Sequence, residues 1–462
     1  MEKPNYKLGH RSRVKDSFLK HGSDVFCDYE ILEILLFYTI PRRDTKGMAH
    51  ALMHEFVTLE GVLTASEEEL CRVDGIGPST ARFLRAILPY ALYVLKNEPR
   101  PRAYRESRDI CKFFEDFFAK NPDVPTVALL LDNSRRPLRL VRFDDVSSIE
   151  GFANRVPELV SQAYIVNAPV IILAGRTFDN VSSNIHLLSD IGGMLGKEFE
   201  KAGVLLLEIV QVTSEQATAV FRHTKGTLQQ AGCVDFIRHS DTDAVFGGSP
   251  EAKEKLSEFL SLAIGKSAAE EAAQKILSSY PSILTASAVP YMTLTERDGV
   301  HSGAALLLRL ALDTYARAKE TSALKRGKPI CVARELGEIF SDVIGPRKNE
   351  TMAIATLDDK MRLMAIKVFG EGTVNTAVFS YRAMMEEAIR QGATYVAVAH
   401  NHPLGVTDPS SNDFAITAGA KNLFDSMKII FLEHFVVTER EFLYTNRALP
   451  DSDKGVPEGF FK

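Results

Sequence analysis

The stretch that decides the fold reads YVAVAHNHP, at residues 395–403. Its five leading apolar residues predict a buried strand. Side chains two positions apart on a strand point to the same face, so His400 and His402 leave the strand together. The pattern therefore places two imidazoles side by side where a buried strand ends.

A carboxylate follows after a short loop. Residues 408–413 (DPSSND) predict a turn and then a helix N-cap, with Asp413 in the first turn of that helix. With His400 and His402, Asp413 would supply three ligands to one small cation and leave a fourth position open to water, as in catalytic zinc sites. Taken singly, each residue fits a structural interpretation: a histidine at a strand end, or a residue of a helix cap.

The complete string, HNHPLG at residues 400–405 and PSSND at residues 409–413, resembles the motif of the JAMM (JAB/MPN) metalloproteases, and specifically of their RadC-type branch. That branch has His-Asn-His-Pro-Ser-Gly followed by Pro-Ser-x-x-Asp. Leu404 stands where the family has Ser, which puts the hydrogen bonding of the loop in question but not the ligands. The resemblance implies one Zn²⁺ per chain, bound by His400, His402 and Asp413.

The resemblance also implies two catalytic residues. Glu350, at the start of the first strand of this domain, matches the family's general base; Glu371 and Glu386 are the alternatives. Ser410 matches the hydroxyl that donates to the developing oxyanion, and its alternative role is the N-cap of the helix that carries Asp413. We expect His434 to be a buried residue next to the site and not a ligand.

The implied reaction is hydrolysis of an amide or isopeptide bond in a protein or peptide. Zinc lowers the pKa of a bound water to about 7 and polarises the scissile carbonyl. Glu350 would take the proton of this water and deliver it to the leaving amine. The resemblance implies the kind of bond and leaves the substrate open.

The same order of patterns occurs twice along the chain. Residues 74–84 (DGIGPSTARFL) and 298–308 (DGVHSGAALLL) both begin with Asp-Gly and lead into a helical pattern. Further on, the strand-like residues 127–132 (VALLLD) match residues 353–358 (AIATLD). This internal similarity predicts a tandem duplication.

With the family resemblance, the repeat predicts an α/β fold with two JAB/MPN-like (cytidine-deaminase-like) modules, each preceded by a small all-helical module. A Pro-rich joint at residues 98–102 (EPRPR) and a second joint at residues 325–329 (KRGKP) separate the helical from the α/β modules. The two α/β modules are expected to pair within the chain. The predicted boundaries are residues 1–98 (helical, with a helix-hairpin-helix-like motif), 104–225 (a JAB-like pseudo-domain), 250–324 (degenerate helical) and 330–450 (a RadC-like domain with the intact motif).

The first α/β copy lacks every ligand of the second. Aliphatic side chains, glycine and threonine stand at the matching positions, and such a set does not hold zinc. We expect a metal-free pseudo-domain that packs or binds a partner; the alternative is a relocated site that uses His186 or Asp190. The residues that match Glu350, His400, His402 and Asp413 are Val124, Gly175, Thr177 and Ile185.

Of the two helical modules, it is the first that keeps the recognisable motif. Gly75 and Gly77 form a Gly-x-Gly hairpin that resembles a helix-hairpin-helix, in which glycines admit a phosphate to the backbone N–H groups of a helix N-terminus. We expect non-specific DNA contact at Gly75, Gly77, Ser79 and Thr80. The alternative is a tight turn between helices without a ligand. His301 replaces Gly77 in the second copy, which is expected to be degenerate.

Composition narrows the classes of protein. A formal net charge of −5 over 462 residues argues against a nucleic-acid binder that uses its whole surface, but not against a local basic patch. The five cysteines form no CxxC pair, which favours a reducing compartment. No signal peptide and no apolar run of membrane length is found, so we expect a cytoplasmic protein without a membrane partner.

Two functions of different classes compete. The first is a zinc metallopeptidase, positioned on DNA by the first helical module. The second is a non-catalytic DNA-associated scaffold whose metal site is structural or vestigial. A metal-dependent nuclease is a third reading, but one His/His/Asp site lacks the carboxylate cluster that holds paired metals about 4 Å apart.

Overall fold

A computed structural model describes most of the chain in two compact units, and each unit is considered by itself. The first unit comprises Met1–Asn97, Lys255–Ala269 and His301–Lys462, and the second comprises Glu98–Glu254 and Glu270–Val300. The described residues are 10–23, 25–41, 43–98, 100–104, 106–146, 149–176, 185–213, 216–223, 241–242, 246, 249–325, 327–347, 349–369, 381–403, 407–446 and 455–461.

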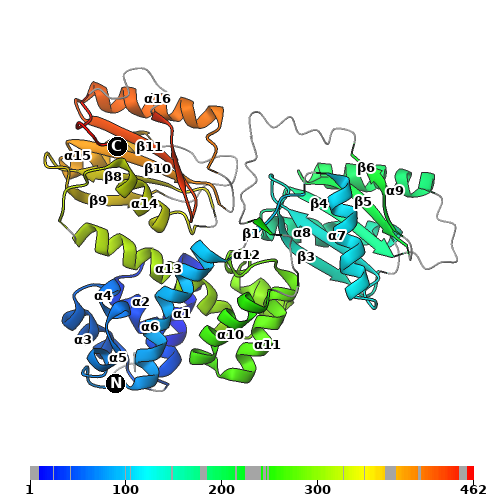
Figure 1. Cartoon of the computed structure of the whole chain (residues 1–462), viewed down its shortest axis with the longest axis horizontal. Coiled ribbons are helices and arrows are strands. Elements are labelled where there is room, and N and C mark those ends of the chain that lie inside the picture. Colours follow the sequence, from blue (N-terminus) through cyan, green and yellow to red (C-terminus); the bar gives the residue numbers. More distant parts are fainter. Residues whose placement is uncertain are drawn as a thin grey trace, which may run out of the picture. The chain divides into compact units, whose positions relative to one another are not determined.

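The described part of the first unit that precedes residue 330 is helical. The longest of its helices, α13 (Ser302–Lys325), packs against α4 and α6 (Figure 1). In α2 every residue from Ile31 to Phe37 is buried, because this helix is apolar on nearly all sides. The elements from the N-terminus are α1 (His10–His21), α2 (Asp28–Thr39), α3 (Lys46–Phe56), α4 (Leu59–Thr64), α5 (Glu67–Leu70), α6 (Pro78–Leu92) and a π-helical turn (Tyr93–Asn97).

The C-terminal part of the first unit is an α/β module with a five-stranded sheet in the order β12-β11-β10-β8-β9. β10 is parallel to β11 and antiparallel to β8. Strands β8 and β10 are almost wholly buried, as their apolar sequences predict. The elements are α14 (Ala333–Val343), β8 (Met352–Leu357), β9 (Leu363–Val368), α15 (Tyr381–Gln391), β10 (Tyr395–Asn401), α16 (Ser411–Ser426), β11 (Ile430–Val437) and β12 (Phe442–Tyr444).

Helices cover both faces of this sheet (Figure 1). One face packs on α14 through Leu336 and Phe340. The other face, which includes Val396 and Val398 of β10, packs on α15 and α16. Because strand side chains alternate, His400 lies on the α16 face with Val396 and Val398.

The second unit contains another α/β module, whose sheet has the order β3-β2-β4-β5-β6. With β2 matched to β8 and β4 to β10, the order and the strand directions are those of the C-terminal sheet. The elements are β1 (Arg100–Pro101), α7 (Ser107–Lys120), β2 (Thr126–Leu131), β3 (Pro137–Phe143), a 3₁₀ helix (Ile149–Arg155), α8 (Val156–Ile165), β4 (Val170–Arg176), α9 (Ile185–Lys201), β5 (Leu205–Val212), β6 (Ala217–Arg222), β7 (Asp241–Thr242), α12 (Ile283–Ser287) and a π-helical turn (Thr293–Arg297). Helices α10 (Pro250–Ile264) and α11 (Lys266–Ser279) contain the unit boundaries. The predicted α/β fold class is confirmed.

Both sheets carry a β-bulge at the same place. In the C-terminal sheet the register shifts between Phe431 and His434, and in the other sheet it shifts between Leu206 and Glu208. A buried glutamate lies at each bulge, Glu433 and Glu208. The Glu433 carboxylate accepts the backbone N–H groups of residues 434, 445 and 446, so it joins the bulge to the residues that follow β12.

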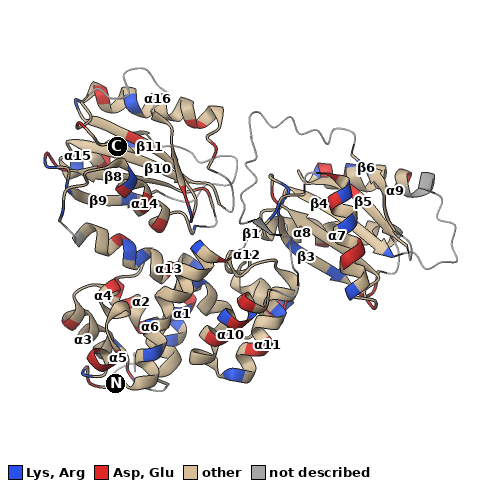
Figure 2. Ribbon diagram, viewed as in Figure 1, with Lys and Arg blue, Asp and Glu red and all other residues tan. Residues whose placement is uncertain are grey.

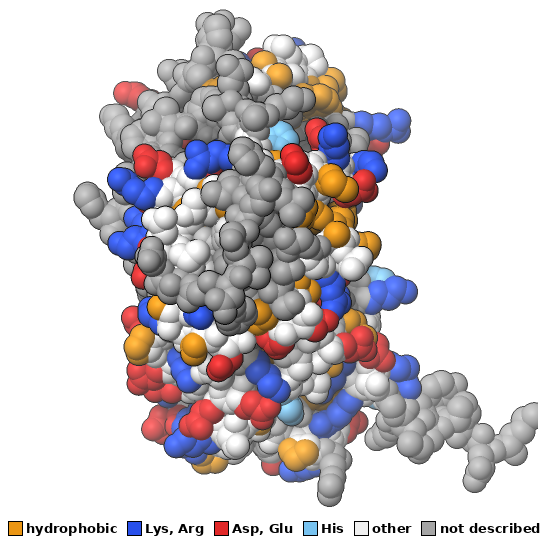
Figure 3. All heavy atoms as spheres, turned by 90° about the vertical axis from the view of Figure 1, so that its right-hand side faces the viewer, with side chains coloured by type: hydrophobic (Ala, Val, Ile, Leu, Met, Phe, Trp, Pro, Cys, Tyr) orange, Lys and Arg blue, Asp and Glu red, His pale blue; other side chains and the backbone are white. Residues whose placement is uncertain are grey.

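Charged residues lie mainly on helices and loops, while the strands are mostly uncharged (Figure 2). Figure 3 shows acidic and basic side chains interspersed on the described surface visible there, with no broad area of one sign. Among the described residues, no helix is both long enough and apolar enough to cross a bilayer.

Candidate metal centre

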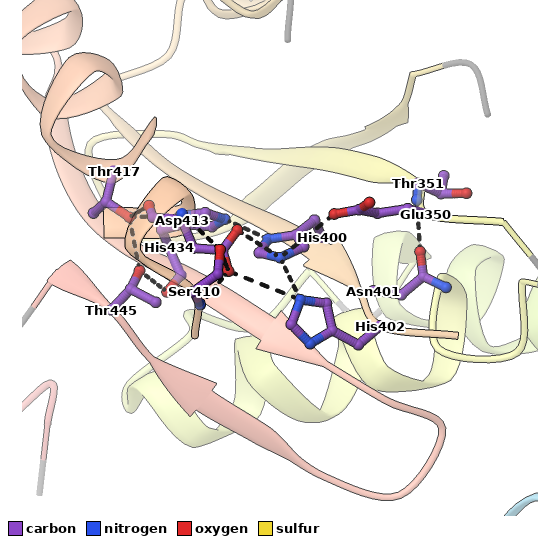
Figure 4. Close-up of polar contacts among 10 residues, drawn as sticks. All are labelled: Glu350, Thr351, His400, Asn401, His402, Ser410, Asp413, Thr417, His434 and Thr445. Carbon is purple, nitrogen blue, oxygen red and sulfur yellow. Dashed lines mark hydrogen bonds and ion pairs between the residues drawn. The ribbon is translucent and has the colours of Figure 1, made fainter. Parts of the chain in front are cut away.

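His400 and His402 lie at the end of β10, with their rings close together (Figure 4). The His400 side chain is fully buried, whereas that of His402, one residue beyond the strand, is 23% exposed. The two Nε2 atoms are 3.1 Å apart. The short distance follows from the extended backbone, which turns both side chains to the α16 face.

Asp413 reaches the same point from the first turn of α16. Its Oδ1 lies 3.1 Å from His400 Nε2, and its Oδ2 lies 3.8 Å from His402 Nε2. The predicted helix cap places it there. Ser410 N and Ser410 Oγ both donate to Asp413 Oδ2, at 2.7 and 2.8 Å, and Ser410 Oγ accepts from Asp413 N at 3.2 Å.

These three side chains fit a small tetrahedral cation. Metal bonds of about 2.0–2.1 Å put two ligands of a tetrahedron about 3.3 Å apart. The distances from His400 Nε2 to the other two ligands, both 3.1 Å, are close to this value, and the distance from His402 to Asp413 is somewhat longer. Nitrogen and carboxylate oxygen atoms are also the donors that zinc prefers.

Glu350 approaches His400 from the side opposite Asp413 (Figure 4). Its Oε1 lies 4.0 Å from His400 Nε2, and the ligand atoms of Glu350, His400 and His402 lie within 4.8 Å of one another. Asn401 holds the strand that follows Glu350: its Oδ1 accepts from Thr351 N at 2.7 Å, and its Nδ2 donates to Arg347 O at 2.9 Å. The buried amide of Asn401 therefore joins the histidine strand to the segment that carries Glu350.

The two carboxylates have opposite pKa shifts. Burial raises the pKa of Glu350, and Asp413 adds to this effect, while His400 only partly offsets it. Burial alone would raise the pKa of Asp413 too, but the contacts with His400 and Ser410 outweigh it and hold that pKa well below its ordinary value. Asp413 is thus the permanent anion of the site, and Glu350 is the carboxylate better able to take up a proton.

His434 lies behind His400 and is fully buried. His434 Nε2 is 2.8 Å from His400 Nδ1, and its Nδ1 is 2.7 Å from Thr417 Oγ1 (Figure 4). Burial keeps the pKa of His434 well below its ordinary value, and the neighbouring His400 lowers it further, so the ring is neutral. Sequence reasoning singled out His434 but missed Asn401 and Thr417, whose roles have no local sequence signal.

Of the two alternatives to Glu350, Glu386 does not meet the histidines. Glu371 lies outside the described residues, as does Leu404. Glu386 is exposed on α15 and pairs with Arg382 at 2.7 Å. Among the described residues, the side chains close enough to share a metal are those of His400 and His402, with either Glu350 or Asp413 as the third.

Among its described residues, the first α/β module brings no such set together. Gly175, at the position of His400, is in β4, and buried Val124 precedes β2. Asp190 is exposed on α9. Thr177 and the side chains of Ile185 and His186 lie outside the described residues.

The hairpin before α6 has the backbone that its glycines predict. Gly75 has φ of +85°, and a Cβ there would lie 2.8 Å from Met48 Cε. Gly77 is the N-cap, with Pro78 at the first helical position and no side chain capping the N–H groups. Ser79 is exposed, whereas the Thr80 side chain is buried, so Thr80 can offer only its backbone N–H to a phosphate.

The second hairpin differs at its helix N-terminus. Gly299 keeps a positive φ of +64°, as Gly75 does. His301, at the position of Gly77, accepts the N–H of Gly303 on its Nδ1 at 3.1 Å. This side chain occupies one of the donors that the first hairpin leaves uncapped.

Comparison with known proteins identifies two segments. Residues 330–448 match the family model of a RadC-like JAB domain, and residues 58–86 match that of a helix-hairpin-helix motif. A UPF0758 protein of Fusobacterium nucleatum is 31% identical over 219 residues, which cover 44% of this chain and 91% of the relative. A UPF0758 protein of Chromobacterium violaceum is 28% identical over 185 residues, 40% of this chain and 82% of the relative.

Proposed function

From the membership of this chain in the UPF0758 family and from the match of its residues 330–448 to a RadC-like JAB domain, we propose that it is a zinc-dependent hydrolase of the JAMM type that cleaves amide or isopeptide bonds. The metal ligands are His400, His402 and Asp413. Glu350 is the general base. One zinc ion per chain is expected.

The observation that carries this proposal is the convergence of His400, His402 and Asp413 at 3.1–3.8 Å, with Glu350 beside them. Two histidines and one aspartate leave a coordination position for water or substrate, which suits a catalytic zinc site better than a structural one. A structural site would use four protein ligands. Glu350 lies too far from His400 for a direct hydrogen bond, which suits a base that acts on a water and not on the histidine.

A zinc ion bound here would acidify a water and polarise the scissile carbonyl. Glu350 would accept the proton of that water and pass it to the leaving amine, a role that its raised pKa favours. Ser410 holds Asp413 in place through the cap of α16. Its further role as an oxyanion donor stays a prediction, because its hydroxyl donates a hydrogen bond to Asp413 Oδ2 here.

We also propose that the two α/β modules arose by tandem duplication and that the first, at residues 104–225, is a metal-free pseudo-domain. Two observations support this: both sheets have the same strand order, and both have a bulge with a buried glutamate at the equivalent position. Register-level agreement of this kind is more specific than a shared fold class. The helical modules at residues 1–98 and 250–324 would be the corresponding first and second copies.

DNA contact through the first hairpin is the second part of the proposed function. Its support is the helix-hairpin-helix match at residues 58–86 and the uncapped N-terminus of α6 after Gly77. The protein would use this contact to act near DNA. The degenerate second hairpin, capped by His301, would take no part.

The first test is elemental analysis of the wild type and of His402→Ala, both purified without added metal. We expect about one zinc per chain in the wild type and none in the variant. His402 lies beyond the end of β10 and is partly exposed, so its removal leaves the core intact. His54→Ala, at an exposed histidine of α3, is the matched control and should keep its zinc.

A second measurement separates a hydrolase from a scaffold. Glu350→Gln should keep zinc and lose the hydrolysis of an internally quenched peptide library that the zinc-loaded wild type cleaves. A folded wild type that neither contains zinc nor takes it up on titration would overturn the metal site and favour the DNA-associated scaffold. Zinc without cleavage that depends on Glu350 would overturn the hydrolase alone.

A further inference from the structure

Two buried side chains extend a hydrogen-bonded line from His400 away from the candidate metal position (Figure 4). His400 Nδ1 contacts His434 Nε2 at 2.8 Å, and His434 Nδ1 contacts Thr417 Oγ1 at 2.7 Å. All three side chains are buried. The line leads from a strand end, through the neighbouring strand, to the helix that supplies Asp413.

Thr417, which has a single hydroxyl proton, determines which atom is the donor in each hydrogen bond of this line. Thr417 Oγ1 lies 2.6 Å from the backbone oxygen of Asp413, an atom that can only accept. Thr445 Oγ1, 2.9 Å from Thr417 Oγ1, donates its own proton to the backbone oxygen of His434 at 2.8 Å. Because Thr417 donates its one proton to Asp413 O, it has none for His434, so His434 Nδ1 is the donor.

The remaining protons follow from the chemistry of a neutral imidazole, which carries one ring proton. With its proton on Nδ1, His434 accepts at Nε2, and the donor to it is His400 Nδ1. A neutral His400 that has its proton on Nδ1 keeps Nε2 free to bind a metal, and this Nε2 lies 3.1 Å from both His402 Nε2 and Asp413 Oδ1. The opposite order would leave two oxygen atoms 2.6 Å apart without a proton between them and would protonate His400 at the ligand nitrogen.

The β-bulge of the C-terminal sheet gives His434 its orientation. Phe431 pairs with Val396, and after the bulge His434 pairs with Val398. Regular alternation from Phe431 would put residue 433 on the α16 face and turn His434 to the face of α14. The extra residue brings His434 behind His400, in line with the use of bulges to re-aim side chains at sites.

We propose that Thr417 and His434 are positioning residues that hold His400 as its Nδ1–H tautomer, with Nε2 ready to bind the metal. This inference rests on the proposed function. A metal-binding histidine needs a partner on its other ring nitrogen, and such partners change metal affinity about 10–100-fold. Here the partner is a second imidazole, which can act in two directions, so the Thr417 hydroxyl is needed to select one.

The experiment compares Thr417→Val, which keeps the shape and removes the hydroxyl, with Thr417→Ser, which keeps the hydroxyl. Zinc affinity is measured by competition with a chromophoric chelator. We expect Thr417→Val to bind zinc about 10–100-fold more weakly and Thr417→Ser to bind as the wild type does. Thr356→Val, at a buried threonine of β8 in the same module, is the control for loss of a buried hydroxyl and should leave the affinity unchanged.

A second readout uses no metal. ¹⁵N-histidine NMR of the metal-free protein should show His400 and His434 protonated on Nδ1. In Thr417→Val a proton on His434 Nδ1 would be a buried donor without an acceptor, the rarest kind of unpaired group. We therefore expect both rings to change to the Nε2–H form in this variant.

The outcomes separate the inference from the function on which it rests. A wild type that does not bind zinc but shows the two Nδ1–H tautomers would overturn the proposed function and keep the proton order. Unchanged tautomers in Thr417→Val, or an equal loss of affinity in the Ser and Val variants, would overturn the positioning role whether or not zinc binds.

Discussion

Ser410 has two predicted roles and one hydroxyl proton. As the N-cap of α16 it shares a capping box with Asp413. As an oxyanion donor it would have to turn that proton away from Asp413 Oδ2, 2.8 Å distant, when the carbonyl is attacked. The chain offers a matched reference for the first role alone, because Ser66 and Glu69 form the same box at the start of α5.

Ser410→Ala and Ser66→Ala should each lower the free energy of unfolding by about 1 kcal/mol, the usual value of a serine cap. If Ser410 also stabilises the oxyanion, its alanine variant should lose a further factor of about 10²–10³ in the rate of peptide hydrolysis at full zinc content. Chemical denaturation and single-turnover rates give the two values. Hydrolysis by zinc-loaded Ser410→Ala at the wild-type rate would mean that Ser410 acts only as the helix cap.

The sequence predicted the candidate ligands better than their surroundings. His400, His402 and Asp413 stand in one short segment, so alternation along a strand and a helix cap are enough to bring them together. Asn401 and Thr417 act through partners distant in the sequence, at Arg347 and His434, and only the tertiary structure brings those partners near. The orientation of the His434 side chain depends on a β-bulge, which has no sequence pattern of its own.

At the scale of elements, the two hairpins show how one residue changes the end of a helix. Both have a glycine with positive φ, at Gly75 and Gly299. Only the second adds a side chain, His301, that takes up a free N–H group. Strands and helices were predictable from their periodicity, whereas the π-helical turns at Tyr93–Asn97 and Thr293–Arg297 were not, because they continue a helical pattern without a break.

Gly77 allows a test of the hairpin in which stability and binding separate. Its φ of −99° is open to any residue, and a Cβ there meets no atom within 4 Å, so Gly77→Ala should change the free energy of unfolding by less than about 1 kcal/mol. The same Cβ would stand where a phosphate approaches the N–H groups, and affinity for a labelled DNA duplex should fall. Fluorescence anisotropy at several salt concentrations measures it.

Gly193→Ala, at another glycine with open space around its Cβ, is the control and should bind DNA as the wild type does. Equal affinity and equal salt dependence in Gly77→Ala and the wild type would mean that the hairpin is a turn without a ligand.

At the scale of the whole molecule, the division into two units does not follow the four predicted modules, because residues 270–300 join the second unit. Within that unit a buried ion pair links the sheet to these residues. Arg139 of β3 pairs with Asp298, whose other oxygen accepts the hydroxyl of Tyr280 at 2.7 Å. Arg139 and Asp298 are separated widely in the sequence, so no local pattern predicts this contact.

Arg139→Met should destabilise the second unit by about 3–5 kcal/mol, because Asp298 would remain as a buried charge without its cation. The chain has no tryptophan, so the measurement is hydrogen exchange followed by mass spectrometry, which also locates the opening. Arg382→Met removes an exposed pair with Glu386 and should leave the protection nearly unchanged. Loss of protection spread equally over both units would contradict a local link.

The buried glutamates at the two bulges, Glu208 and Glu433, indicate which features the two modules share apart from the candidate metal site. Glu208 is buried in the module where Gly175 stands in place of His400, and there its carboxylate accepts from Ser107 Oγ and pairs with Arg222. A feature kept without the chemistry beside it belongs to the architecture and not to the reaction. If the modules descend from one ancestor, mutation could erase the metal site at single positions such as Gly175, while the irregular strand persisted as the older inheritance.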